Sequence, residues 1–254
     1  MQIGAQFYPV REQCKPLDDF ALTLKKVADI GYKTVQISGT CPYEADWLKE
    51  QLAINDLKCV LTHIPVPKLV GETEQVIADH FTFDCPYIGL GYYSFDESKE
   101  DATYDHFMKT FVPVAEKIRA GGKYFMYHNH DNEFKLAPGE NKQIVLEKLA
   151  EEIPADMMGF TLDTYWVQVG GGDPAQWVEK LAGRVPAIHL KDFAFGRKMA
   201  VVGEGNINFD RVFREAEKAG TKFMLVEQDD CNGEDPIECL RRSYEYLKAC
   251  GFNR

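Results

Sequence analysis

The chain of 254 residues carries 29 lysine and arginine residues against 40 aspartate and glutamate residues, a formal net charge of −11. With 45% hydrophobic and 27% charged residues, its composition is that of a globular protein with a sizeable core. The acidic balance disfavours nucleic acid and anionic membranes as main partners, because both are polyanions.

Short β-rich runs alternate along the chain with longer segments of helical periodicity. Strands are expected at residues 3–7, 34–38, 59–62, 87–90, 124–128, 159–162, 187–190 and 223–227. The expected helices lie near 17–30, 43–55, 72–82, 101–120, 141–150, 174–182, 207–219 and 235–250. Gly31, Gly121 and Gly220 are expected to end three of them in a left-handed conformation, and Asp173 and Asp235, each followed by proline, to cap two others.

About eight β/α units with right-handed crossovers close most economically into a (β/α)8 TIM barrel, which commonly fills about 250 residues. We therefore expect an α/β protein in which residues 1–254 form a single barrel domain. A doubly wound open sheet is the alternative. It is expected to place a glycine-rich phosphate turn after the first strand, and the segment FYPVR that follows that strand contains no glycine.

The seven cysteines are scattered and form no CxxC pair, which fits a reducing compartment. The N-terminal segment has neither the basic region nor the long apolar region of a signal peptide, and no apolar run approaches the roughly 18 residues of a membrane span. We expect a cytoplasmic protein.

Residues that bind metals or transfer protons follow several predicted strands, where the catalytic groups of a barrel lie. They are His63 after the third strand, His128, His130 and Glu133 at the fifth, Asp163 at the sixth, His189 and Lys191 at the seventh, and Glu227 at the eighth. Each has an ordinary alternative: Asp163 as a capping carboxylate, His189 as a core histidine, Lys191 and Asp192 as a surface pair. Their convergence on one face of the expected barrel favours a functional site.

Carboxylate and imidazole ligands together suit a divalent metal of intermediate hardness, such as Mn, Co, Zn or Mg. Two or three carboxylates with one or two imidazoles would leave positions for substrate oxygens. Tyr8 and Trp166 lie near strand ends, where aromatic faces suit a sugar ring, although core packing is the more frequent role of aromatics. The glycine-rich segment 201–208 is expected to form a flexible loop of the kind that often contacts ligand, and Asn208 to cap the helix after it.

Five segments taken in order resemble the xylose-isomerase-like barrel family of sugar phosphate isomerases and epimerases, which includes ketose 3-epimerases, inosose dehydratases, hydroxypyruvate isomerases and endonuclease IV relatives. The segments are YHNHDNEF, LDTYWVQVGGGDP, RVPAIHLKDF, VGEGNINF and VEQD, and the resemblance covers nearly the whole chain. It implies a divalent metal at the ends of the fifth to eighth strands. Asp163, His189 and Glu227 match three ligand positions.

For the fourth ligand the resemblance implies a fifth-strand group, and we favour Glu133 over His128 or His130. Two positions depart from the epimerases: Trp166 stands in place of a histidine, and Gln36 replaces a glutamate common at the end of the second strand. These departures argue against simple ketose 3-epimerisation.

The implied activity is a metal-dependent isomerase or epimerase of a sugar-like keto or hydroxy substrate. Proton abstraction beside a metal-polarised carbonyl would give an enediolate. The catalytic candidates are Glu227, His128, His130 and Lys191, of which Lys191 would stabilise oxyanion charge, and the substrate-binding candidates are Tyr8, His63 and Trp166.

Three alternatives stay open. The first is a lyase or dehydratase acting on an inosose or a 3-keto-glycoside. The second is an endonuclease IV-like phosphodiesterase, which the charge of −11 disfavours. The third is a metal-free sugar-binding barrel. The expected partner is a small carbohydrate, with no nucleic acid or membrane, and family habit suggests a homodimer.

Overall fold

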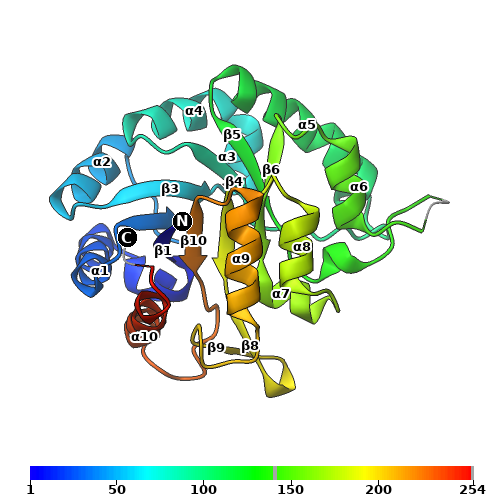
Figure 1. Cartoon of the computed structure of the whole chain (residues 1–254). Coiled ribbons are helices and arrows are strands. Elements are labelled where there is room, and N and C mark those ends of the chain that lie inside the picture. The colour runs from blue at the N-terminus through cyan, green and yellow to red at the C-terminus, as the bar shows by residue number, and fades with distance from the viewer. Residues whose placement is uncertain (140–141, 253–254) are drawn as a thin grey trace.

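The computed structural model describes residues 1–139 and 142–252 and contains a closed barrel of parallel strands (Figure 1). In chain order the barrel strands are β1 (Gln2–Gln6), β2 (Thr34–Ile37), β3 (Lys58–His63), β4 (Tyr87–Leu90), β5 (Tyr124–His128), β6 (Met158–Asp163), β7 (Ala187–Leu190) and β10 (Phe223–Val226). Each pairs with its sequence neighbours, and β1 pairs with both β2 and β10 to complete the ring. The predicted (β/α)8 fold is confirmed, and β4, β5 and β7 have the predicted bounds.

Helices surround the barrel on the outside (Figure 1). The longer ones are α1 (Leu17–Ile30), α2 (Ala45–Ile54), α4 (Thr73–Thr82), α5 (Tyr104–Ala120), α6 (Val145–Glu152), α8 (Pro174–Lys180), α9 (Phe209–Ala219) and α10 (Pro236–Ala249). They lie where the sequence predicts them, within a few residues. The predicted start of the sixth helix, residue 141, lies outside the described residues.

Barrel strands are buried on both faces, because one face looks into the barrel and the other meets the helices. All residues of β2, β4, β6 and β7 are buried. The helices bury only one stripe: in α9 the buried residues are Phe209, Val212, Phe213, Ala216 and Ala219, a spacing that follows the helical repeat. This difference explains why the strands appear as apolar runs in the sequence and the helices as periodic ones.

Helix ends follow the predicted cap residues with one exception. Asp173, Asn208 and Asp235 each accept a backbone N–H of the helix that they begin. Gly31 and Gly220 have positive φ values of 123° and 79°. The prediction for Gly121 is wrong, because Gly121 has a φ of −78° and the next glycine adopts the positive φ instead.

The segments that periodicity did not predict are short and lie between a barrel strand and the helix that follows it. They include η1 (Tyr8–Cys14), α3 (Val66–Gly71), α7 (Thr164–Val169) and a hairpin of β8 (Asp192–Ala194) and β9 (Lys198–Ala200); the further 3-10 turns are η2 (Glu100–Ala102), η3 (Asn132–Phe134) and η4 (Phe195–Arg197). Elements of three to seven residues are too short to show a clear period. No helix in the described part of the chain is both long and apolar enough to cross a membrane.

Candidate active site

Four side chains from neighbouring strands converge at the carboxyl end of the barrel. They are His128 at the end of β5, Asp163 at the end of β6, His189 in β7 and Glu227 directly after β10, all buried, with one ligand atom of each lying within 4.8 Å of the others. Strand register creates this proximity: Asp163 pairs with His189 across β6 and β7, and the Glu227 N–H donates to the carbonyl of Leu190 (3.1 Å). We call these four residues the strand-end group.

Each histidine of the strand-end group is anchored through one ring nitrogen and directs the other into the group. His128 Nδ1 lies 2.9 Å from the carbonyl of Gly91, an acceptor, so this nitrogen carries the proton and Nε2 faces Asp163 Oδ2 at 3.3 Å. His189 Nε2 donates to Gln36 Oε1 (2.6 Å), so Nδ1 faces Glu227 Oε2 at 2.7 Å. A hydrogen bond at the outer nitrogen is the usual way in which proteins orient a metal-binding histidine.

Two glutamines, from β1 beside β10 and from β2, hold the strand-end group in place. Gln6 and Gln36 are paired in register across β1 and β2, and both are fully buried. Gln6 Nε2 donates to Glu227 Oε1 (2.6 Å), while Gln36 accepts from His189. Gln36, the departure noted in the sequence, is therefore a positioning residue, and Gln6 is a member of the site that the sequence reasoning missed.

Lys191 supplies positive charge to the same place. Its Nζ lies 3.0 Å from Asp163 Oδ2, 3.0 Å from Glu227 Oε2 and 3.0 Å from an oxygen of Asp229, and its side chain is buried. One ammonium thus faces three carboxylates, and even with a protonated His189 beside Glu227 the negative charges outnumber the positive ones. Buried charges need compensation, so this excess makes the site suited to a further cation.

The buried charges shift one another's pKa values. Burial alone would raise the pKa of Glu227 and of Asp163, but His189 and Lys191 at Glu227, and Lys191 and His128 at Asp163, outweigh it and hold both pKa values below their usual range. Burial would lower the pKa of His189, yet Glu227 and Asp163 raise it to about 9. Both carboxylates are therefore ionised at neutral pH.

The strand-end group has the properties of a site for a divalent cation. His189 Nδ1 and Glu227 Oε2 are buried without a hydrogen bond of normal geometry in the described part of the chain, and both face the other members of the group. The donor set is two imidazole nitrogens and two carboxylates, and the carboxylates near Lys191 outnumber the positive charges beside them. Ligands of these types suit a divalent metal of intermediate hardness. A proton and a metal would compete for His189 Nδ1, so metal binding would release a proton.

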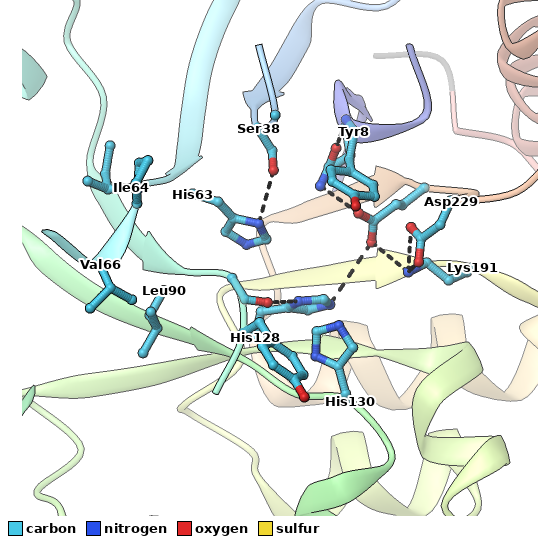
Figure 2. A pocket seen from close by; sticks show the side chains of 16 residues that line it. Tyr8, Ser38, His63, Ile64, Val66, Leu90, His128, His130, Lys191 and Asp229 are labelled. Carbon is cyan, nitrogen blue, oxygen red and sulfur yellow. Dashed lines mark hydrogen bonds and ion pairs between the residues drawn. The ribbon is translucent and has the colours of Figure 1, made fainter. Parts of the chain in front are cut away.

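A cavity of about 540 Å³ opens in front of the strand-end group, and His128 and Glu227 line it (Figure 2). Tyr8, His63, His130 and Lys191, all predicted as site residues, line it too. His63 is packed against His128 at 5.2 Å between ring centroids, and its buried Nε2 has no hydrogen bond within the described residues. Burial and the neighbouring His128 lower the pKa of His130 to about 2, so its imidazole is neutral at pH 7.

Glu133, favoured from the sequence as the fourth ligand, lies apart from the strand-end group. It is fully buried in η3, where one carboxylate oxygen accepts from the Tyr127 hydroxyl and the other from the backbone N–H of His130 (2.8 Å). Both oxygens are thus occupied by the loop itself. Burial raises the pKa of Glu133 to about 7. The fifth strand contributes His128 to the group instead, the alternative that the sequence left open.

Trp166 and the glycine-rich loop differ from their expected places. The Trp166 backbone N–H donates to Asp163 Oδ1 (3.0 Å), so Asp163 caps α7 while its other oxygen faces the strand-end group. The Trp166 ring packs beside His130 and is not among the described residues that line the cavity. Residues 201–208 do not line it either, because their backbone is bonded to Asp192.

Asp229 is a second site residue that the sequence reasoning did not select. It lines the cavity beside Lys191. Burial and the nearby charge of Glu227 raise its pKa, and Lys191 opposes that shift only in part. The sequence indicates this position, because Asp229 follows Glu227 by two residues and the two side chains of an extended segment then lie on the same side.

A closed barrel whose strand ends carry two histidines, an aspartate and a glutamate, two of which line a cavity, belongs to the α/β barrels with a polar site at the carboxyl face. The chain is a member of the xylose isomerase-like TIM barrel family, which it matches over residues 24–250.

Known relatives agree with this membership at low sequence identity. The inosose dehydratase of Clostridium botulinum (strain Alaska E43 / Type E3) is 23% identical over 229 residues, 82% of this chain and 72% of the relative. The solved structure of a sugar phosphate isomerase/epimerase from Parabacteroides distasonis ATCC 8503 is 23% identical with a TM-score of 0.84, covering 100% of this chain and 95% of the other. The structure of L-ribulose 3-epimerase has a TM-score of 0.76 at 16% identity, covering 99% of this chain and 95% of the other.

Proposed function

We propose that the protein is a divalent-metal-dependent enzyme that isomerises or epimerises a sugar-like hydroxy ketone. The observation that supports this most is the strand-end group, whose inner nitrogen and oxygen atoms are directed toward one another by partners behind them. A buried arrangement of this kind at the floor of a cavity has no evident role in holding the barrel together. The names of several relatives point to the same chemistry.

In this proposal His128, Asp163, His189 and Glu227 hold the cation. When bound, the cation supplies Lewis-acid polarisation of a substrate carbonyl. Gln6 and Gln36 keep Glu227 and His189 oriented toward it.

Proton transfer is assigned to residues that line the cavity and keep a free atom. One oxygen of Glu227 accepts from Gln6, and the other is ion-paired with His189 and Lys191. His130 lines the cavity, and its Nδ1 has no hydrogen bond within the described residues, so this nitrogen is free to accept a proton from carbon. The Lys191 ammonium stabilises negative charge that develops on the substrate oxygen.

Dehydration is a second outcome of the same site. Two relatives, from Clostridium botulinum and Clostridium beijerinckii, are named inosose dehydratase and match 82% and 90% of this chain. Elimination begins with the same removal of a proton beside a carbonyl and then requires an acid for the leaving hydroxyl. Asp229, with its raised pKa and its place on the cavity wall, suits that role. Cleavage of DNA fits less well, because the Glu227 and Asp229 carboxylates line the cavity and would repel a phosphodiester.

The test is hydrogen exchange in D2O. The purified protein is treated with a chelator and supplied with Mn, Co, Zn or Mg, then incubated with ketoses, inososes and 3-keto-glycosides. We expect one of these metals to raise the unfolding temperature and to permit exchange of a substrate C–H, which NMR detects. Loss of a hydroxyl together with exchange would identify the lyase.

Glu227→Gln is expected to lower the exchange rate by about 100-fold, because it removes a carboxylate that holds the cation. Glu217→Gln, at an exposed position of α9, is the matched control and should behave as wild type. Failure of every metal both to stabilise the protein and to permit exchange would contradict the proposed function.

A further inference from the structure

The cavity in front of the strand-end group has two ends of opposite chemistry. In Figure 2 the Tyr8, Lys191 and Asp229 side chains lie at one end, Ile64, Val66 and Leu90 lie at the other, and the rings of His63 and His128 lie between them. Pro65, between Ile64 and Val66 in the chain, also lines the cavity. A ligand that fills the cavity therefore meets charged groups on one side and hydrocarbon on the other.

The lining does not suit a phosphate group. Lys191 is the one cationic side chain among the described residues that line the cavity, and its ammonium is already shared by three carboxylates. Arg11 lies nearby, but its guanidinium stacks on the Tyr8 ring at 4.1 Å and donates to the carbonyls of Tyr8 and Asp229. A sugar phosphate would bring roughly two further negative charges to this surface without a free cation to receive them.

The apolar end is exposed in a way that a bound group would cover. Val66 is 40% exposed, although it is a large hydrophobic residue at the cavity wall. The cavity volume of about 540 Å³ lies within the range of about 300–1,000 Å³ that holds ligands larger than a single sugar ring. A second cavity of about 270 Å³ shares His63, Ile64 and Pro65 with the first, so more space adjoins the same end.

We infer that the substrate is an unphosphorylated sugar derivative that carries an apolar substituent, such as a glycoside with an aromatic aglycone. The sugar ring lies at the end with Lys191 and the strand-end group, and the substituent packs against Ile64, Val66 and Leu90. Burial of an aromatic ring against these side chains contributes binding free energy through the hydrophobic effect. The polar end of the cavity cannot supply this contribution. The assignment of the sugar end rests on the proposed function, whereas the assignment of the apolar end rests on the lining alone.

Matched ligands test the inference by calorimetry on the metal-loaded protein. Phenyl β-D-glucoside, methyl β-D-glucoside and glucose 6-phosphate differ in the substituent and in charge. We expect the phenyl glucoside to bind at least about tenfold more tightly than the methyl glucoside, and glucose 6-phosphate to bind more weakly than both. Equal affinity for the two glucosides, or tighter binding of the phosphate, would overturn the inference.

Two valines on the same short helix provide the variant and its control. Val66 and Val70 both lie in α3 and are both 40% exposed, but only Val66 is among the residues that line the cavity. Val66→Asp is expected to reduce the preference for the phenyl glucoside by about tenfold, and Val70→Asp, which adds the same charge to the same helix, to preserve it. Equal effects of the two substitutions would assign the preference to charge alone and contradict the apolar subsite.

Hydrogen exchange with the 3-keto forms of the same glucosides separates this inference from the proposed function. Exchange at equal rates with phenyl and methyl forms would support the proposed function and overturn the subsite. A preference for the phenyl glucoside in binding without exchange under any metal would support the subsite and contradict the proposed function.

Discussion

Lys191 and Asp192 are neighbours in the sequence, and both are buried, yet their side chains serve different parts of the molecule. Lys191 faces the carboxylates of Asp163, Glu227 and Asp229, each at 3.0 Å. Asp192 accepts four backbone N–H groups at 2.8–3.1 Å, from Phe193, Gly203, Gly205 and Ile207. Successive side chains of an extended chain point to opposite sides, so one residue contributes to the cavity and the next to the loop behind it.

The two environments show what distinguishes a functional buried charge from a structural one. The backbone N–H groups around Asp192 satisfy its carboxylate completely and bring no second ionised group. The groups around Lys191 leave more negative than positive charge and face a cavity. Incomplete compensation beside a cavity indicates a site for another charged or polar species, whereas complete compensation indicates support of the fold.

Substitution of Lys191 is expected to have the largest effect, and that effect is on activity. Lys191→Met should lower kcat/KM by about 100-fold, because the substrate oxyanion loses its ammonium partner. Lys198→Met, at an exposed position of β9, should leave kcat/KM unchanged. Steady-state kinetics on the substrate found by the exchange screen provide the measurement. A change of less than threefold in the Lys191 variant would remove this residue from the chemistry.

For Asp192 the main effect is expected on stability. Asp192→Asn should lower the free energy of unfolding by about 2 kcal/mol, because an amide replaces part of the acceptor with N–H donors that face the donors of the loop. The loop backbone approaches this carboxylate so closely that a Cβ at Gly205 would clash with Asp192. Denaturant unfolding measures the change, with the exposed Asp210 changed to Asn as the control. Equal stability of the two variants would show that the carboxylate is not needed for the loop.

The smallest effect concerns Glu133, a buried carboxylate without a cation beside it. Its pKa in the folded protein is about 7 and in the unfolded chain is near the ordinary value for glutamate, so the folded state binds more protons between these values. Stability therefore falls as pH rises through this window, by about 1 kcal/mol between pH 5 and pH 6. Glu133→Gln should remove this contribution. The comparison of unfolding free energies at the two pH values, in wild type and variant, measures it; identical slopes would contradict the assignment.

The strands and long helices could be predicted because burial on both faces, or on one stripe, leaves a regular pattern in the sequence. Short elements such as α3 and α7 could not, since six residues contain less than two helical turns. The sequence also could not show that Gly122, rather than Gly121, adopts the positive φ at the end of α5. Either glycine tolerates a positive φ, and only the packing of the turn decides between them.

The site was predictable where a strand end alone determines a position. Asp163, His189 and Glu227 lie at strand ends, and parallel register brings them together whatever the loops do. Glu133 lies in a loop, five residues beyond the end of β5, and its direction depends on hydrogen bonds to Tyr127 and His130 that sequence spacing does not reveal. The contacts of Gln6 and Gln36 could not be predicted for another reason, because each joins residues more than 150 positions apart, Gln6 to Glu227 on neighbouring strands and Gln36 to His189 across the barrel.

The sequence by itself determined the barrel and the types of side chain at its carboxyl face, because both follow from local patterns repeated along the chain. The tertiary structure decided which of these side chains share one cavity, which nitrogen of each histidine faces inward, and where the charge is left uncompensated. It also placed hydrocarbon opposite that charge, on a loop and a strand far from it in the sequence. These properties depend on distances between residues remote in the chain, and only the closed barrel determines those distances.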